Sequence, residues 1–558
     1  MRVETDRSRP PCPPAATPTA TALARELVRL RLERGLSLRR LARLVGMTAH
    51  SGLVDYERGV RIPPDDLMAM IVRALRPADD RLARLYRAAV AERARQKLAA
   101  GPHGGAGCAA ERDLDTLLAE GTDALVVHGD PPAGRQHFER AHQLAERAGD
   151  PVALGIAALG LSGLWPQQQR TAAGAALVCT RLRHALSLVD PQSSLGLRLR
   201  IRLAAEGDDP AGTHTAVLAA LDEARSVPDP VARVEALGLA HHCLLGPDHG
   251  ELRRALAVEL VEESVRTGRR GDVLTGVLWR TVAAFLEADP RAQRLLMELR
   301  ELLAAGNHRA VAFVADAMDV MLTIRSGRFD EAEALARACA QRGAAIGDVN
   351  SVGWLGTHLV AIRWFQGRLP ELLPGLRVMV HSPVLSARDH SGFAALAVAA
   401  AQAGSRREAA GALATLCGRG LANLPRSTTW LGTMGGVVEA AHLLRDRDTS
   451  ARAYELLEPF AHLPAMSGPA VVCFGSVHHS LGVAALTTGD ADRSVEHLRA
   501  AITGHLAMAH WPAVMTSRVR YAQALTLRGR PDDAAAARLE LATAAEEAAA
   551  MGIAPPAV

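Results

Sequence analysis

The chain has little of several residue types, and each scarcity narrows the possibilities. Lys97 is the only lysine against 63 arginines, a bias expected of a GC-rich genome. Aromatic residues make up 3% of the chain, although 49% of it is hydrophobic. Sandwiches and barrels favour aromatic and β-branched residues, so this composition favours helices rich in alanine and leucine. The 558 residues exceed one hydrophobic core, which predicts several domains or a repeat array.

Paired cysteines and long apolar runs are also missing. The seven cysteines are widely scattered with no CxxC spacing, which fits reduced thiols better than a disulfide framework. No run approaches the 18 or so apolar residues of a membrane span. Residues 1–21 are rich in proline and threonine and lack the apolar segment of a secretion signal. We therefore expect a cytoplasmic protein with no membrane partner.

Charge is unevenly divided along the chain. Residues 1–100 carry 20 Lys and Arg against 11 Asp and Glu, whereas the other 458 residues carry 44 against 49. The net formal charge of +4 therefore combines a basic end with an acidic remainder. This asymmetry indicates a polyanionic partner such as nucleic acid, the alternative being a solvated basic face.

A repeat of about 40 residues runs through the long C-terminal part, where apolar residues recur at helical spacing from about 113 to 552. Turn glycines followed by Arg, Asp or Ser recur at steps of 40, 37, 85 and 40 residues, at Gly327, Gly367, Gly404, Gly489 and Gly529. The step of 85 is two units, with the intervening turn expected near Arg445–Asp448. A two-helix unit of this length predicts an α-solenoid, and it resembles tetratricopeptide repeats with lengthened helices.

Residues 22–97 indicate about five short amphipathic helices. A first helix over about 23–34 ends at Gly35, and Ser37 is placed to cap a second, LRRLARLV. A third helix follows over about 50–57, and two prolines open a fourth. The apolar spacing predicts a small shared core from five side chains: Leu41, Val45, Leu53, Tyr56 and Leu67.

The segments LRRLARLVGM and DYERGVRIPP resemble the Cro/repressor-like (XRE) helix-turn-helix family over about 55 residues. The resemblance implies that the third helix enters the DNA major groove, with base edges met by residues at its N-terminal end: His50, Ser51, Gly52 and, one turn on, Asp55. It places five residues at phosphates, which position a protein without reading sequence: Ser37, Arg39, Arg40, Arg58 and Arg61.

Two features depart from the commonest pattern of that family. The interval between Gly46 and Gly59 is one residue longer, and Gly52 and Asp55 stand where Gln, Arg or Ser is more usual. Aspartate accepts from cytosine but is repelled by phosphate. These departures leave two readings open, an unusual base preference or a helix-turn-helix kept for protein contact.

The long helical part resembles the C-terminal repeat half of STAND-type ATPase regulators, including LuxR-type activators, at residues 133–165, 302–336 and 473–502. That half is thought to sense ligands or partners. The segment VVHGDPPAGRQ (126–136) mimics a phosphate-binding loop, but Arg135 and Gln136 replace the Lys and Ser/Thr that the loop needs. We therefore predict a turn followed by a helix there, and no nucleotide or other cofactor.

One aromatic cluster stands out in the repeats, formed by Trp354, His358 and Trp364. Trp354 and His358 are four residues apart, on one helix face. This face is predicted to line a ligand groove, and the alternative is repeat core. The proline-interrupted connections 381–390, 423–430 and 462–470 are long enough to rim the same groove. The scattered histidines lack the spacing of a structural zinc site, so no metal is expected.

The sequence thus predicts an all-α protein with four segments: a disordered tail (1–21), a five-helix helix-turn-helix domain (22–97), a Gly-rich linker (98–112) and a TPR-like α-solenoid (113–552). The expected function is transcriptional regulation in the cytoplasm, at the nucleoid. The expected partners are double-stranded DNA, a second copy of the chain, and a small molecule or peptide bound by the solenoid. A protein-interaction scaffold is the alternative. No catalytic constellation supports an enzyme.

Overall fold

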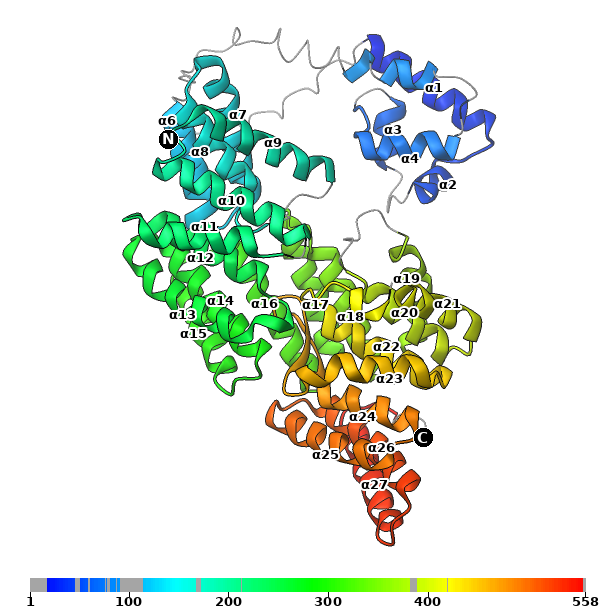
Figure 1. Ribbon diagram of the computed structural model, residues 1–558. Coiled ribbons are helices and arrows are strands. Elements are labelled where there is room, and N and C mark those ends of the chain that lie inside the picture. The colour runs from blue at the N-terminus through cyan, green and yellow to red at the C-terminus, as the bar shows by residue number, and fades with distance from the viewer. Residues whose placement is uncertain are drawn as a thin grey trace, which may run out of the picture. The chain divides into compact units, whose positions relative to one another are not determined.

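The computed structural model is almost entirely helical, and its described residues fall into two compact units, Met1–Ala110 and Glu111–Val558 (Figure 1). The expectation of an all-α fold, with a short helical unit ahead of helical repeats, is confirmed. The predicted linker, 98–112, lies outside the described residues. The structure describes residues 18–45, 51–58, 61–75, 77, 81–86, 88–90, 114–166, 172–211, 213–381, 389–418 and 420–554.

The N-terminal unit has four helices with defined bounds: α1 (Pro18–Glu33), α2 (Leu38–Leu44), α3 (Ser51–Glu57) and α4 (Asp65–Leu75). Residues 81–86 and 88–90 are helical as well. Helix α1 begins at Pro18, so residues 18–21 of the predicted tail form its first turn, while residues 1–17 lie outside the described part. All five predicted core side chains are buried in one apolar cluster together with leucines of α1.

Helices of the second unit stack along the chain, each packing on its neighbours (Figure 1). Its first half comprises α6 (Leu114–Thr122), η1 (Asp123–Val127), α7 (Pro131–Ala148), α8 (Pro151–Ser162), α9 (Ala172–Leu188), α10 (Ser194–Ala211), α11 (Thr215–Ser226), α12 (Pro230–Cys243), η2 (Pro247–His249), α13 (Gly250–Arg266), α14 (Arg270–Leu286) and α15 (Ala292–Ala304). The segment that mimics a phosphate-binding loop forms η1, a turn and the start of α7, as predicted.

The second half continues the stack and adds two strands. It comprises α16 (Arg309–Arg325), α17 (Phe329–Ala345), α18 (Ser351–Phe365), η3 (Leu369–Leu372), α19 (Leu373–Met379), α20 (Ser391–Gln402), α21 (Arg406–Cys417), η4 (Leu421–Asn423), α22 (Trp430–Leu444), α23 (Arg447–Leu457), η5 (Glu458–Phe460), β1 (Pro464–Ser467), β2 (Val472–Ser476), α24 (Val477–Thr488), α25 (Ala491–Ala507), α26 (Trp511–Arg528) and α27 (Asp533–Ala550).

The turns between paired helices lie where the repeat predicts them. All five predicted turn glycines have positive φ, between 66° and 89°. The turn missing from the glycine series is at Arg445, whose φ of 62° places it in the same left-handed region. Arginine is strained there and glycine is not. The repeat spacing therefore predicted a turn at a position where the residue itself, an arginine, does not indicate one.

A β-hairpin interrupts the helices at 464–476, where the sequence predicted a connection over 462–470 and helix beyond it. Strands β1 and β2 pair antiparallel, with Met466 opposite Cys473 and Ser467 opposite Val472. Nearly every residue of both strands is buried, and three residues of β2 or its approach, Val471, Val472 and Cys473, belong to the largest apolar core. The helical prediction was wrong here because a short, fully buried strand and a short helix share the same unbroken apolar pattern.

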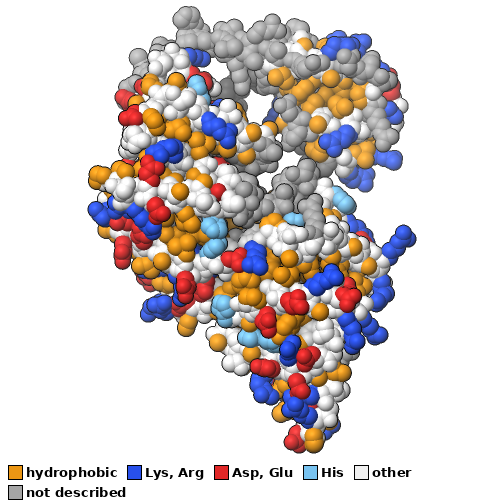
Figure 2. Space-filling view, in the orientation of Figure 1, with side chains coloured by type: hydrophobic (Ala, Val, Ile, Leu, Met, Phe, Trp, Pro, Cys, Tyr) orange, Lys and Arg blue, Asp and Glu red, His pale blue; other side chains and the backbone are white. Residues whose placement is uncertain are grey.

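Contacts between distant segments tighten the array beyond neighbour-to-neighbour stacking. Arg309 N donates to His128 O at 2.9 Å and Ala310 N to Gly129 O at 3.0 Å, which joins the turn before α7 to the start of α16. On the surface, basic and acidic side chains are interspersed over the face seen in Figure 2, and ion pairs such as Arg198–Glu235 (2.7 Å) join neighbouring helices, here α10 and α12. Within the described chain, no helix is both long and apolar enough to traverse a bilayer.

Candidate DNA-binding surface and ligand cavity

Helix α2 begins at a side-chain cap. Ser37 has an extended backbone (φ −74°, ψ 156°), and its Oγ accepts a hydrogen bond from Arg40 N at 3.2 Å. This bond satisfies one of the amides left open at the start of a helix. Arg39 and Arg40 follow in the first turn, and both are exposed. The cap therefore fixes where α2 begins, and with it the position of these two arginines.

Helix α3 is held in place by an ion pair with α1. Arg31 Nε lies 2.5 Å from Glu57 Oε1, and Arg31 Nη2 donates to Glu57 Oε2 at 2.9 Å. Arg31 Nη1 also donates to Leu36 O at 2.9 Å, in the turn before α2. Both charged side chains are only 11–12% exposed. The hydrogen bonds that Arg31 donates to Glu57 raise the pKa of Arg31.

Four arginines surround α2 and the end of α3 without any ion pair to a residue that the structure describes: Arg39, Arg40, Arg58 and Arg61. All four are exposed. By contrast, Arg29 on α1 pairs with Glu26 at 2.5 Å and with Glu33. The unpaired arginines leave positive charge beside α2 and the end of α3, as a phosphate-binding surface needs.

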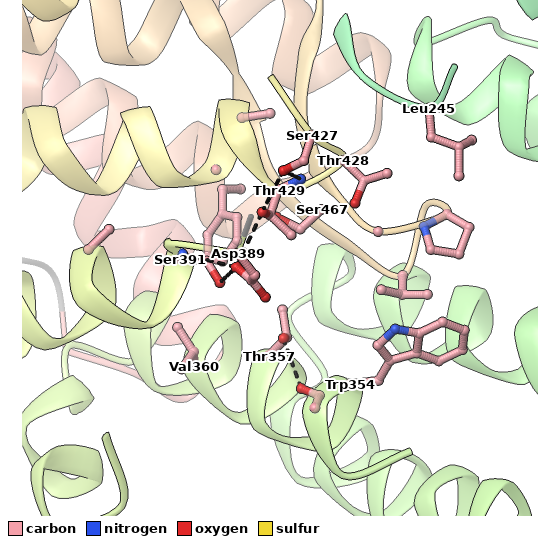
Figure 3. Close-up of a pocket in the computed structure, with 18 of the residues that line it drawn as sticks. Leu245, Trp354, Thr357, Val360, Asp389, Ser391, Ser427, Thr428, Thr429 and Ser467 are labelled. Atoms are coloured by element: carbon pink, nitrogen blue, oxygen red, sulfur yellow. Dashed lines mark hydrogen bonds between the residues drawn. The ribbon is translucent and has the colours of Figure 1, made fainter. Parts of the chain in front are cut away.

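The second unit contains a cavity of about 770 Å³, within the range of small-molecule sites. Helices α18, α20 and α22, the connection 426–429 and the β-hairpin supply most of its wall (Figure 3). Further lining residues come from the segment after α8, from the end of α12 and from α14. Residues far apart in the chain, from Trp165 to Thr516, thus line the same cavity.

Glycines flatten two of the helical walls. On α18, Gly353 and Gly356 line the cavity, and a β-carbon built at either would have no heavy atom within 4 Å. On α22, Gly432, Gly435 and Gly436 face the same space. A glycine inside a helix costs about 1 kcal/mol relative to alanine. The cost at Gly353 and Gly356 is not offset by close packing, so these positions keep the space open.

Tryptophans supply much of the apolar lining. Four of the six tryptophans in the chain line the cavity: Trp165, Trp279, Trp354 and Trp364. Trp354 stacks on Phe313 with ring centroids 4.8 Å apart and an interplanar angle of 11°. Trp364 meets Phe474 of β2 edge-on at 5.7 Å. These contacts hold each indole in one orientation.

A polar group centred on Asp389 interrupts the apolar wall (Figure 3). Asp389 Oδ1 accepts three hydrogen bonds, from Ser391 N (3.0 Å), Ser391 Oγ (2.6 Å) and Thr429 Oγ1 (3.3 Å). Ser427 Oγ lies 3.2 Å from Thr429 Oγ1 and extends the group. The three bonds all use one oxygen, so the carboxylate is oriented by its neighbours while Oδ2 accepts nothing from the described residues.

Two other charged side chains at the cavity, Glu439 and Arg426, form ion pairs. Glu439 on α22 forms an ion pair with Arg520 of α26, which lowers the pKa of Glu439 although burial opposes the shift. Arg426 Nη1 lies 2.6 Å from Asp248 Oδ1, so this pair joins the connection 426–429 to η2. Asp389 forms no ion pair with any residue that the structure describes.

Three buried histidines fasten the hairpin that forms part of the wall. His358 Nε2 donates to Val471 O and His510 Nε2 to Cys473 O, both at 3.0 Å. His505 Nε2 accepts from Ser476 N at 2.6 Å, which requires a neutral ring. Burial lowers the pKa of His358 to about 4, that of His510 to about 3 and that of His505 well below its usual range.

Comparison with known proteins identifies the N-terminal unit. Residues 27–77 match the family model of helix-turn-helix domains. The N-terminal unit is a helix-turn-helix domain. No curated protein matches the chain. Among solved structures, it is similar to PlcR of Bacillus thuringiensis in complex with the peptide PapR7 and DNA, at 11% identity and a TM-score of 0.27, covering 51% of this chain and 95% of that one.

In the helix-turn-helix domain, the structure locates some of the residues predicted to meet DNA. Ser37 is the cap of α2, and the four arginines lie exposed around it. His50 lies outside the described residues. Ser51, Gly52 and Asp55 belong to α3, but their side chains are outside the described part. Base contacts therefore stay a prediction.

In the repeat unit, Trp354 and Trp364 line the cavity, whereas His358 does not. His358 is 1% exposed and points to the hairpin instead. The connections predicted as a rim contribute Asp389, Arg426–Thr429, Ala465 and Ser467–Pro469 to the lining, and residues 382–388 lie outside the described part. Among the described residues, no group of His, Cys, Asp or Glu is arranged to hold a metal ion.

Sequence reasoning missed the polar group around Asp389. Its members Asp389, Ser391 and Thr429 come from two connections 40 residues apart, and none belongs to a motif. The one available signal was the unusual length of both connections. The sequence could also have predicted that the glycines of α18 and of α22 share a helix face, because GxxG spacing places two residues on the same side of a helix.

Proposed function

We propose that the protein is a transcriptional regulator that binds double-stranded DNA through its helix-turn-helix domain. The match of residues 27–77 carries this proposal, and the exposed, unpaired arginines around α2 support it. In this role Ser37, Arg39, Arg40, Arg58 and Arg61 contact phosphates. Residues at the start of α3, which are His50, Ser51, Gly52 and Asp55, meet base edges in the major groove.

We further propose that the repeat unit senses a ligand in its cavity and that the chain acts as a cytoplasmic homodimer. One helix-turn-helix module buries only about 600–1,000 Å² on DNA, so two copies are normally needed. For a ligand to control DNA binding, it must bind one conformation of the protein better than the other. The enclosed space, with its aromatic wall and oriented carboxylate, supports such a ligand site.

The salt dependence of DNA binding tests the central claim. Affinity for duplex genomic fragments is measured between 50 and 200 mM salt, where each phosphate contact contributes about −0.9 to the log–log slope. Replacing Arg39 and Arg40 together by alanine is expected to reduce the slope by about 1.8 in magnitude. A salt-independent affinity would overturn the proposal.

Arg29→Ala is the matched control. Arg29 lies in the same domain and carries the same charge, but Glu26 and Glu33 already neutralise it. We expect the salt slope of this variant to equal that of the wild type. Light scattering with and without DNA tests the homodimer, and a monomer in both conditions would contradict it.

A further inference from the structure

The chemistry of the cavity identifies a class of ligand. We infer that the cavity binds a flat aromatic compound carrying a positively charged amine, with the amine at Asp389 and the ring system against the glycine faces and Trp354. This inference rests on the proposed ligand-sensing role of the repeat unit. It concerns one site within that unit and does not depend on DNA.

The charge argument comes first. Glu439 and Arg426 line the cavity but are each paired with a residue of opposite sign. Asp348 lies in the turn before α18, where its Oδ1 accepts a hydrogen bond from Asn350 N at 2.7 Å. Asp389 forms no ion pair among the described residues, and its hydrogen bonds from Ser391 and Thr429 orient it. A carboxylate in a half-enclosed apolar space favours a ligand that brings the missing positive charge and a donor.

The shape argument concerns the two glycine faces. Without β-carbons, α18 presents an open flat strip at Gly353 and Gly356, whereas the glycines of α22 let hydroxyl side chains approach closely, Ser467 at Gly432 and Ser480 at Gly435. Flat backbone surfaces next to an indole favour a planar ring system. Trp354 has one face covered by Phe313, and it also lines the cavity, where an aromatic cation gains from both stacking and cation–π attraction.

An extended peptide fits the wall less well. Every peptide residue brings a backbone donor and acceptor that must be satisfied when buried. Asn350 is the one amide side chain among the described residues that line the cavity. The backbone amides of α18 and α22 are already used within the helices, so a peptide backbone would depend on the indole N–H groups and the side-chain hydroxyls for its partners.

A pair of size-matched probes tests the inference. 9-Aminoacridine and anthracene-9-carboxylate are both flat tricyclic molecules, one a cation and the other an anion at pH 7.5. Binding to the full chain without DNA is followed by calorimetry and by quenching of tryptophan fluorescence. The cation is expected to bind at least about tenfold more tightly than the anion.

Two variants assign the effect to the cavity. Asp389→Asn keeps an acceptor for Ser391 and Thr429 but removes the charge, and it is expected to abolish the preference for the cation. Gly356→Leu fills the space and is expected to weaken both probes by at least about tenfold. Asp222→Asn removes an exposed carboxylate on α11, outside the cavity, and is expected to change nothing.

The outcomes separate this inference from the proposed function. Binding of neither probe, equal or tighter binding of the anion, or an unchanged preference in Asp389→Asn would each overturn the ligand class. A heptapeptide mixture that binds while both tricyclic probes fail would overturn it in favour of a peptide site. If the cation binds as expected but the chain shows no salt-dependent DNA affinity, the ligand site stands and the DNA-binding proposal fails.

Discussion

Arg31 and Glu57 form a two-pronged ion pair that fastens α3 to α1, with an Nε–Oε1 distance of 2.5 Å. The Glu of the Tyr-Glu-Arg-Gly motif therefore has a structural task at the end of the helix predicted to read DNA. The adjacent Arg58 is exposed and unpaired within the described chain. The motif thus combines an anchor and a surface cation in consecutive residues.

Glu57→Gln is expected to loosen the helix-turn-helix domain. The change leaves the guanidinium of Arg31 nearly buried and without its counter-charge, which costs about 1–3 kcal/mol. Faster hydrogen exchange in residues 23–57, with unchanged exchange in α16–α18, is the expected result. Glu33→Gln is the control, because the Arg29–Glu33 pair is about half exposed and such pairs contribute less than about 1 kcal/mol. Equal effects of both variants would contradict the anchoring role.

Gly246→Ala is expected to destabilise the repeat unit. A β-carbon there would clash with the carbonyl oxygen of Arg426, on the connection that lines the cavity. Displacing that connection costs about 1–3 kcal/mol. Gly238→Ala on α12 is the matched control, since a β-carbon there meets nothing within 4 Å. It should instead raise the unfolding free energy by up to about 1 kcal/mol. Urea unfolding measures the change in unfolding free energy of each variant, which is expected to be negative for Gly246→Ala and positive for Gly238→Ala.

Arg325→Met is expected to stabilise the repeat unit. Arg325 is 5% exposed, forms no ion pair with any described residue, and its Nε has no partner. Burial lowers the pKa of its guanidinium. Replacing an uncompensated buried charge by an apolar side chain of similar length should gain about 1–4 kcal/mol. A loss of stability in urea unfolding would contradict this reading.

Arg253→Met, by contrast, is expected to destabilise the repeat unit. Arg253 is 1% exposed, but it pairs with Glu287 and donates to the carbonyl oxygens of Leu244 (3.0 Å) and Gly246 (2.8 Å). Its removal leaves Glu287 and two carbonyls without their partner, which should cost about 3–5 kcal/mol. The same substitution thus has opposite expected effects at two buried arginines.

The free energy of unfolding is expected to fall as the pH falls from 7 to 5. His358 has its pKa lowered to about 4 in the folded chain, against about 6.5 when unfolded. Below pH 6.5 the unfolded chain takes up a proton that the folded chain excludes, so acid favours unfolding. At pH 5.5 this amounts to about 1.4 kcal/mol for one such group. Burial lowers the pKa of His479 to about 4 as well, so the losses accumulate.

His358→Gln separates this histidine from the others. Glutamine retains a donor for Val471 O but does not titrate, so the slope of stability against pH should decrease while the hairpin stays attached. Calorimetric melting temperatures at pH 7.5 and 5.5 give the comparison. An unchanged slope would show that His358 takes up its proton equally in the folded and unfolded chains.

The sequence alone determined the local features of this protein. The individual helices of the helix-turn-helix domain, the cap at Ser37 and each turn of the repeat, including the one at Arg445, depend on residues within a few positions of each other. Helical periodicity, capping and left-handed turns are short-range effects, so composition and spacing sufficed. The net positive charge of the N-terminal end likewise follows from the sequence alone.

Only the tertiary structure decided where distant segments meet. It brought Asp389 and Thr429 together, turned His358 toward the hairpin, and paired Arg31 with Glu57 and Arg426 with Asp248. It also decided that 464–476 is a hairpin, since a buried apolar run has no periodicity to distinguish strand from helix. These outcomes depend on packing between residues 26 to 178 positions apart, for which no local pattern carries a signal.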